Sequence, residues 1–254
     1  MSFWCTVFYS CSKDSTPPPP EEEVPEEEQP EEQDTLQNHL LAYYPFSGNV
    51  LDESGNNNNL VVNGATLTSD RFNKANTAYS FNGIDQTMTI PSFSVDSALN
   101  GFTISLWAKP EQTNSGYILS FRKDSNNDCP NSIWIENNPA QYNVRCNFST
   151  SFQPENFCSA ALLYKTIQEP VNKWIHIVMV VDPVKAYNKQ FHLYVDGEKV
   201  SSGSMKLEPT TFKDGGIIGA PFYNADFYKG AIDDIRIYDT NLSEAQVTVL
   251  YTSK

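Results

Sequence analysis

The sequence predicts an all-β fold. Two observations predict it. Short runs rich in β-branched and aromatic residues, such as Thr87 to Ile90, alternate with turn residues, and the long connections are rich in Asn, Ser and Gly. Hydrophobic residues make up 39% of the 254 residues and aromatic residues 13%, which is enough for one sizeable core.

Individual strands are predicted from side-chain alternation. In the run from Phe102 to Lys109, apolar residues occupy every second position, so one face packs against the core and the other is amphipathic. The run from Phe191 to Asp196 alternates in the same way. Trp174 to Val181 is apolar on nearly both faces, as a central strand would be. Ser243 to Gln246 has the pattern of a capping box and predicts one short carboxy-terminal helix. Two further strand-like runs are Leu40 to Phe46 and Ala78 to Phe81.

The negative charge is concentrated at the amino end. The formal net charge is −14, and residues 1–34 carry ten acids against one base, which leaves −5 for residues 35–254. An acidic domain behind an acidic arm would repel phosphate groups. Nucleic acid and anionic membrane surfaces are therefore not expected partners.

The amino-terminal residues predict an anchor and a spacer. Residues 1–11 hold an apolar run that ends at Ser10 and Cys11, and this pattern resembles a bacterial lipoprotein signal peptide in which Cys11 receives the lipid. No Lys or Arg precedes the run, so the true translation start is left open. Residues 12–35 are rich in Pro and Glu and predict a disordered, extended tether. The alternative is a disordered amino terminus with a chance Cys.

This arrangement predicts a location at the cell surface. The acidic stretch that follows Cys11 resembles the export signal of Bacteroidota lipoproteins. The expected location is the outer membrane, lipid-anchored and either surface-exposed or periplasmic, with membrane contact through the lipid anchor only.

Three cysteines of the domain lie within one segment. They are Cys129, Cys146 and Cys158. Three thiols cannot pair completely, so we expect one disulfide and one free thiol, with the pairing left open. Metal ligation is the less favoured alternative, because no CxxC spacing or neighbouring His accompanies them.

The segments of the domain resemble those of concanavalin A-like, laminin-G jelly rolls found in bacterial secreted proteins. The resemblance rests on Ala42 to Asn56, Ala78 to Asp85, Phe102 to Lys109, Tyr194 to Gly197, and Gly230 to Tyr238 followed by Leu242 and Ser243. These segments occur in order across residues 40–251. The resemblance implies a single jelly-roll domain over residues 36–254, a β-sandwich of two antiparallel sheets.

The same resemblance implies a structural calcium ion. In this family the first loop, here with Asp52, Asn56 and Asn57, meets the acidic pair of the last long strand, here Asp233 and Asp234, around Ca²⁺. Calcium prefers six to eight hard oxygen ligands, which such a loop supplies. Two adjacent acids in a packed strand also need a compensating positive charge. The alternative is that Asp52 and Asn56 make turn hydrogen bonds and one acid of the pair binds Arg236.

Two segments, Trp134 to Tyr142 and Phe222 to Tyr228, are candidates for ligand contact. Sugar recognition needs exposed aromatic faces beside amides or carboxylates. The candidate residues are Trp134, Tyr142, Tyr223, Asp226 and Tyr228. The alternative for each ring is that it fills the core between the sheets. The loop from Asp124 to Asp128 imitates a calcium loop but lacks the required Gly and closing acid, so we expect a polar loop.

Catalytic motifs are missing from the sequence. The Glu-x-Asp-x-x-Glu strand of jelly-roll glycosidases is absent, as are HExxH, GxSxG and glycine-rich phosphate loops. His176 and His192 lie in predicted strands and are expected to be structural. The leading hypothesis is a surface-tethered, non-enzymatic module that binds a glycan or glycoprotein. The alternatives are a protein-binding adhesion domain of an outer-membrane complex and a polysaccharide hydrolase with an unfamiliar site.

Overall fold

The computed structural model of this protein describes most of the predicted domain. The described residues are 36–92, 101–111, 115–121, 131–138, 141–150, 159–185, 188–205, 215–221 and 225–253. The predicted signal segment and tether lie outside them, as do Cys129, Cys158 and the loop from Asp124 to Asp128.

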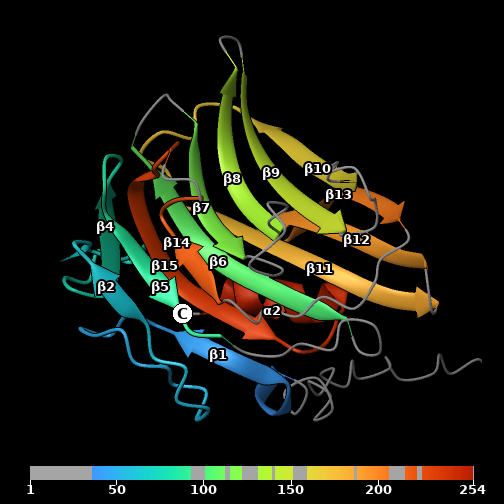
Figure 1. The fold of residues 1–254 in the computed structure, drawn as a ribbon, viewed down its shortest axis with the longest axis horizontal. Coiled ribbons are helices and arrows are strands. Elements are labelled where there is room, and N and C mark those ends of the chain that lie inside the picture. The colour runs from blue at the N-terminus through green and yellow to red at the C-terminus, as the bar shows by residue number, and fades with distance from the viewer. Residues whose placement is uncertain are drawn as a thin grey trace, which may run out of the picture.

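The described elements are a short helical segment at residues 36–38, a series of strands and a carboxy-terminal helix (Figure 1). Their bounds are β1 Leu40–Tyr44, β2 Val61–Asn63, β3 Thr66–Thr68, β4 Ala78–Asn82, β5 Thr87–Ile90, β6 Phe102–Pro110, β7 Gly116–Phe121, β8 Asn131–Asn138, β9 Gln141–Thr150, β10 Ser159–Ile167, β11 Ile175–Lys185, β12 Asn188–Val195, β13 Glu198–Met205, β14 Gly216–Ile218, β15 Lys229–Tyr238 and α2 Glu244–Thr252.

The strands form two antiparallel sheets. Sheet A has the order β13-β12-β11-β6-β15-β4-β3, with β1 paired to β15 off this path, and sheet B has the order β10-β9-β8-β7-β14-β5-β2. Both sheets mix strands distant in sequence, as in the pairing of β6 with β11 and β15. The prediction of an antiparallel jelly-roll sandwich is confirmed.

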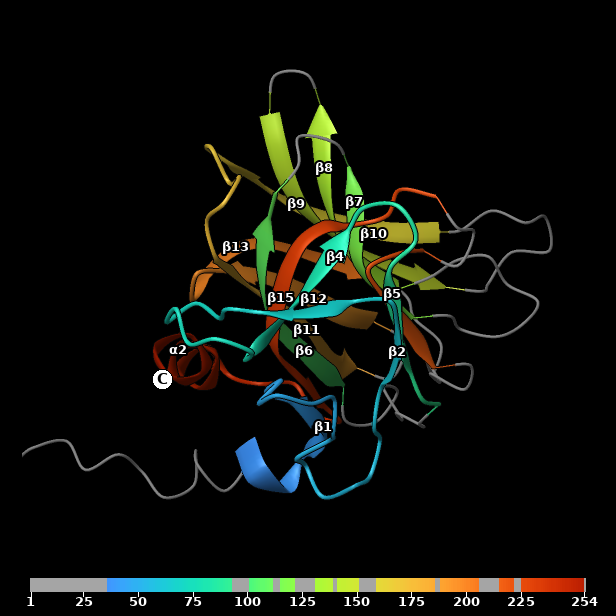
Figure 2. The same ribbon diagram turned by 90° about the vertical axis from the view of Figure 1, so that its left-hand side faces the viewer.

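The main core lies between the sheets. Sheet A contributes the alternating residues Phe102, Ile104 and Leu106 of β6, and sheet B contributes residues such as Ile133 and Cys146. Residues two positions apart in a strand share a face. The predicted alternation therefore directs these side chains into the core. Figure 2 shows β15 of sheet A between α2 on one side and the sheet B strands β5 and β7 on the other.

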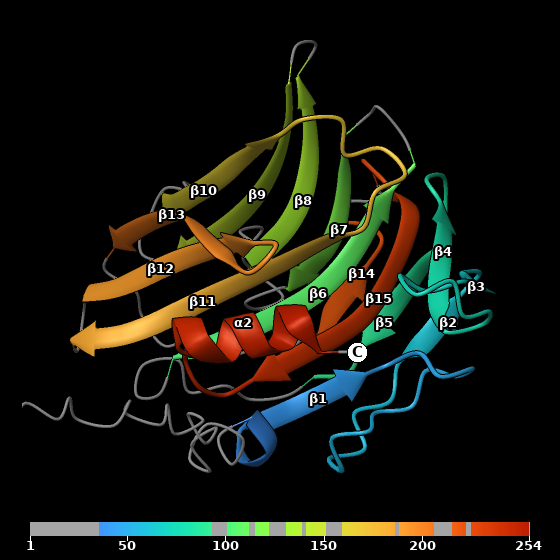
Figure 3. The same cartoon turned by 180° about the vertical axis from the view of Figure 1, so that it is seen from behind.

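The outer face of sheet A is covered as well. Helix α2 lies across β6, β11 and β15 (Figure 3). Val247 and Leu250 of the helix form a second apolar cluster with Val178, Val180 and other residues of that face. The predicted capping box at Ser243 and Gln246 is present in full. Within the described ranges, no helix is long and apolar enough to cross a membrane.

A β-bulge in β15 determines where its acidic residues lie. The register with β6 shifts between Asp233 and Arg236, and Asp234 has φ 49°. A bulge inserts one extra residue and lets two consecutive side chains leave the strand on the same side. Ile232 and Ile235 on either side of the pair both belong to the core. Asp233 and Asp234 therefore both face outward.

Cys146 is a free thiol, and it is the cysteine of the domain that the structure describes. Its side chain is fully buried between the sheets, and it forms no disulfide. The prediction that one of the three stays unpaired fits Cys146. A disulfide between the other two stays a prediction, because both lie outside the described residues.

We expect Cys146 to resist alkylation in the native protein. The side chain has 0% exposure, and burial raises the pKa of the thiol, so neither access nor thiolate is available to iodoacetamide. Peptide mass spectrometry should find Cys146 labelled only after urea is added. Native labelling, or a disulfide-linked Cys146 peptide, would contradict this placement.

Candidate functional site

One row of side-chain positions crosses the outer face of sheet B. Tyr117 on β7 pairs with Trp134 on β8, Trp134 pairs with Arg145 on β9, and Arg145 pairs with Tyr164 on β10. Directly paired residues lie on the same side of an antiparallel sheet, about 4.8 Å apart from strand to strand. We call Tyr117, Trp134, Arg145 and Tyr164 the sheet-B row.

The row lies on the side away from the core. Val144 and Cys146, the sequence neighbours of Arg145, both belong to the core. The side chain of Arg145 therefore lies on the opposite face of the sheet, away from the core. Its guanidinium carbon lies 5.8 Å from the centroid of the Tyr164 ring, a cation–π distance. Tyr164 is 56% exposed and Tyr117 is partly buried. The Tyr164 end of the row therefore presents an aromatic side chain to solvent.

The two segments predicted to contact a ligand meet beside this row. The Tyr117 amide donates to the carbonyl of Asp226 at 3.0 Å, and Tyr117 also forms a bridge with Phe227. Trp134 is the partner of the same Tyr117 on its other side. Asp226 is exposed and has φ 49°. The structure thus joins Trp134 and Asp226, which are distant in sequence, at one end of the row.

The remaining predicted ligand residues have different outcomes. Tyr142 shares a strand face with the core residue Val144 and is partly buried. Tyr223 lies outside the described residues. The prediction for Tyr228 is wrong: its ring is 1% exposed and packs in the core near Phe81, with ring centroids 6.3 Å apart. The segment before β15 turns inward at this residue, where its amide binds the carbonyl of Gly219.

A polar cluster occupies the outer face of sheet A. Arg71 Nη1 donates to Asp233 Oδ2 at 2.6 Å, and Nη2 donates to Asp234 Oδ2 at 2.9 Å. Arg236 Nε lies 2.9 Å from Asp234 Oδ1, and its Nη2 donates to the Tyr43 hydroxyl at 3.2 Å. Two acids and two bases thus neutralise one another in a nearly buried setting.

Burial raises the pKa of Asp233 to about 7; Arg71 opposes this shift and Asp234 adds to it. The direction reflects the cost of moving a carboxylate out of water, a cost that the guanidinium must offset. The ion pairs with Arg71 and Arg236 confirm the prediction that the acidic pair has a positive partner.

Two cavities adjoin this cluster and share Tyr43 and Arg236. One has a volume of about 270 Å³ and is lined in part by Arg71, Phe72 and Lys74. The other has about 590 Å³. Its lining is Leu36, Gln37, Leu40, Tyr43, Glu53, Arg236, Tyr238 and Val249.

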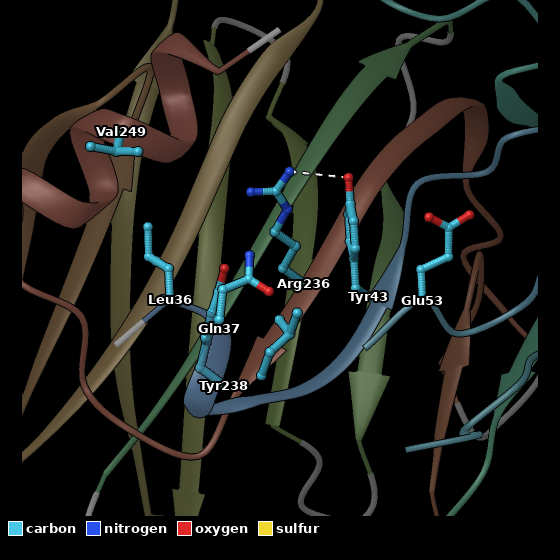
Figure 4. A pocket seen from close by; sticks show the side chains of 8 residues that line it. Leu36, Gln37, Tyr43, Glu53, Arg236, Tyr238 and Val249 are labelled. Carbon is cyan, nitrogen blue, oxygen red and sulfur yellow. Dashed lines mark hydrogen bonds between the residues drawn. The ribbon is translucent and has the colours of Figure 1, made fainter. Parts of the chain in front are cut away.

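Figure 4 shows the larger cavity, with Arg236 pointing toward the Tyr43 hydroxyl, Glu53 beside Tyr43, and Leu36 and Val249 on the opposite side. The cationic group of this cavity is already engaged within the protein, by Asp234 and Tyr43. We place the candidate ligand face on sheet B, because the Tyr164 ring of that face is exposed to solvent.

The contacts of the predicted calcium residues do not fit a shared ion. Asp52 Oδ1 accepts from the amides of Tyr43 and Ser54, and Oδ2 accepts from the amide of Asn58. Asn56 donates its amide group to the carbonyls of Leu40 and Leu41.

Asp52 and Asn56 thus make hydrogen bonds within their own turn and to β1, as the alternative to a calcium site predicts. Asn57 is exposed with φ 59°, and Asp233 and Asp234 face Arg71. In the part of the chain that the structure describes, no group of three or more His, Cys, Asp or Glu residues is placed to hold a metal.

Several important residues were missed from sequence. Tyr164 has no clear alternation signal, because Leu162 and Leu163 are adjacent apolar residues and Tyr164 and Lys165 are both exposed. Arg145 and Tyr117 become informative only through the strand register. Arg71 has no local signal that connects it to Asp233, which lies 162 residues further along the chain.

These features define a jelly-roll domain with one covered face and one face that carries an exposed aromatic side chain. Residues 82–248 match the family model Laminin_G_3, described as the concanavalin A-like lectin/glucanases superfamily. The chain therefore belongs to this superfamily.

Comparisons with known proteins agree on the fold. A curated relative, adhesion G-protein coupled receptor V1 of Danio rerio, is 19% identical over 177 residues, which is 68% of this chain and 3% of the receptor. The chain thus spans a small part of that protein.

Three similar solved structures cover most of this chain. Domain 4 of AbnA, a GH43 extracellular arabinanase from Geobacillus stearothermophilus solved in complex with arabinotriose, has a TM-score of 0.55 at 20% identity and covers 84% of this chain and 98% of that one. The binding domain of Paraclostridial Mosquitocidal Protein 1 has a TM-score of 0.65 at 20% identity and covers 86% and 53%.

The botulinum neurotoxin serotype D ligand binding domain, solved with N-acetylneuraminic acid, has a TM-score of 0.66 at 14% identity and covers 88% and 53%. This chain spans about half the length of the two toxin chains. At these identities the likeness shows the fold.

We expect His176 to make stability fall in acid. It is 1% exposed, its Nε2 lies 2.9 Å from Ser105 Oγ, and burial, with the charges of Arg71 and Arg236, lowers its pKa from 6.5 to about 3. Between these values the unfolded chain takes up a proton here and the folded chain does not. The free energy of unfolding should therefore fall by about 1.4 kcal/mol per pH unit of acidification below 6.5.

The measurement is urea unfolding across a pH series for the wild type and His176→Gln. The free-energy difference between the two proteins removes the contribution of all other titrating groups. Just below pH 6.5, this free-energy difference should change by about 1.4 kcal/mol per pH unit. Parallel pH profiles would show that His176 does not titrate as its burial requires.

Proposed function

We propose that this domain is a carbohydrate-binding module whose ligand lies on the outer face of sheet B. The observation that carries the proposal is the sheet-B row, which sets aromatic residues of β7, β8 and β10 in register with Arg145 between two of them. Aromatic faces stack on the C–H faces of sugars, and neighbouring polar groups bind the hydroxyls.

Other polar groups of the same face support this proposal. Asn143 lies two residues before Arg145 on the outward side of β9, and its side-chain oxygen accepts from Thr166 Oγ1 at 2.8 Å. Exposed Asp226 lies beside Tyr117 at the other end. Arg145 and Asp226 offer a guanidinium and a carboxylate, groups that orient sugar hydroxyls, whereas Asn143 is buried and fixes the Thr166 side chain beside them.

The relatives support a glycan as the ligand class. Domain 4 of AbnA is matched over nearly its whole length and was solved with arabinotriose. The serotype D toxin domain was solved with N-acetylneuraminic acid, although this chain covers only about half of it. We propose binding without chemical conversion of the glycan.

We expect Tyr164→Ala to weaken glycan binding about tenfold, because an exposed stacking partner contributes on the order of 1 kcal/mol. The full chain would be screened on a glycan array that includes arabinotriose and glycans ending in N-acetylneuraminic acid. Calorimetry would then measure affinity for the best glycan with the wild type, Tyr164→Ala and Trp134→Ala.

Phe72→Ala is the matched control. Phe72 is 52% exposed, close to the 56% of Tyr164, but it lies on the sheet A side beside Arg71. It should leave affinity unchanged, with circular dichroism confirming the fold of each variant. Failure to bind any glycan, or equal affinity for the wild type and both sheet-B variants, would refute the proposal.

We further propose that the domain is held at the cell surface by lipid on Cys11, with residues 12–35 as the tether. The apolar run before Cys11 and the Pro- and Glu-rich spacer after it support this arrangement. In a bacterial host, the full chain should sediment with membranes and Cys11→Ala should move to the soluble fraction. Equal partition of the two proteins would argue against a lipid on Cys11.

A further inference from the structure

The acidic pair on β15 requires a strong positive partner. Asp233 and Asp234 are buried, and the bulge directs both carboxylates to the same side of sheet A. Two like charges held close together in a poorly hydrated place repel one another and each loses its hydration. A cation must sit between or beside them for the bulge to keep this form.

Arg71 supplies that cation in a forked arrangement. Its two terminal nitrogens each bind one carboxylate, at 2.6 Å for Asp233 and 2.9 Å for Asp234. A guanidinium is suited to this task because it is planar, always charged and has fixed paired donors. One side chain therefore bridges the two acids, as a bound metal ion would.

Aromatic rings hold the guanidinium in place. Its central carbon lies 4.6 Å from the ring centroid of Phe72 and 4.9 Å from that of Trp107. Trp107 pairs directly with Asp233 in the register of β6 and β15. Arg71 thus fits between its carboxylates and two ring faces, an environment that a hydrated metal ion would not prefer.

The loop that carries Arg71 is built to present it. Asp70 Oδ1 accepts from the amides of Phe72 and Lys74, and Oδ2 accepts from Thr77 Oγ1 at 2.7 Å. These bonds close the turn around the Arg71 backbone. Asp70 therefore stabilises the loop, and the ion pairs of Arg71 hold the loop against β15.

We infer that Arg71 takes the place of a bound cation in this domain, clamping the loop of residues 70–77 to β15, so that the fold is independent of calcium. With Arg236 as the second base, two guanidinium groups balance two carboxylates, and a divalent ion could enter only by displacing a paired guanidinium. The oxygens of Asp52 are engaged by backbone amides and add no ligand.

The test is thermal unfolding of the full chain in millimolar calcium chloride and in excess chelator. The wild type should unfold at the same temperature in both. Arg71→Ala should lower the midpoint by about 10 °C, because it leaves two buried acids without their partner. Arg71→Lys should fall between the two, since an ammonium cannot bridge both carboxylates in the same way.

Lys74→Ala is the matched control, because Lys74 is an exposed base in the same loop. It should leave the midpoint close to that of the wild type. The Arg71 variants should also be made in a chain that carries Asp233→Asn and Asp234→Asn, where loss of the guanidinium should cost much less. This second background keeps the test valid if Arg71→Ala alone does not fold.

Two results would overturn the inference. One is a chelator that lowers the midpoint of the wild type, which would show that calcium is part of the fold. The other is an Arg71 variant whose midpoint matches that of Lys74→Ala, or whose loss is as large with the two asparagines as with the two aspartates. Neither result would bear on glycan binding, so this inference and the proposed function can fail separately.

Discussion

The structure depends on the burial of sheet A on both of its faces. Strands β6, β11 and β15 pack against sheet B on one side and lie under α2 on the other. A polar side chain on such a strand cannot rely on water and must find a partner inside the protein. Thr103 does so by binding the backbone at Thr240 and Leu242, and Ser105 does so by binding His176. The ion pairs of Arg71 follow the same rule, and a buried charge costs more to leave unpaired than a buried hydroxyl group.

The outer faces of the two sheets differ in role, because the outer face of sheet A is buried. The outer face of sheet A is filled by the helix, by stacked rings such as Trp107 and Tyr251, and by charges that are already paired. Its cavities are therefore lined by groups that serve the fold. The outer face of sheet B carries the sheet-B row, with Tyr164 open to solvent. The exposed ring of Tyr164 can therefore serve recognition without disturbing the core.

The sequence predicted the fold well and the site only in part. Alternation identified β6, β12 and the doubly buried β11, and the capping box identified α2, because these signals are local. The acidic pair was also recognised as needing a positive partner. That partner is a guanidinium far away in the chain, and long-range register cannot be read from local pattern.

The ligand residues show the same limit. Trp134 and Asp226 were proposed separately, and only the strand order brings both beside Tyr117. Tyr228 was proposed as a ligand residue because it is the last residue of an aromatic and polar segment that was predicted to be a loop. The chain turns inward before β15 and buries this ring. Tertiary packing determines this burial, and the local composition does not predict it.

The most direct test of this account is to map where a glycan touches the domain. Amide chemical shifts of the isotope-labelled full chain would be recorded during titration with the best glycan from the array, beginning with arabinotriose. The account predicts that perturbed amides cluster on β7 to β10 and around Asp226. Perturbations that cluster instead around Tyr43 and Arg236, beside α2, would contradict it, because they would place recognition on the face assigned here to the fold.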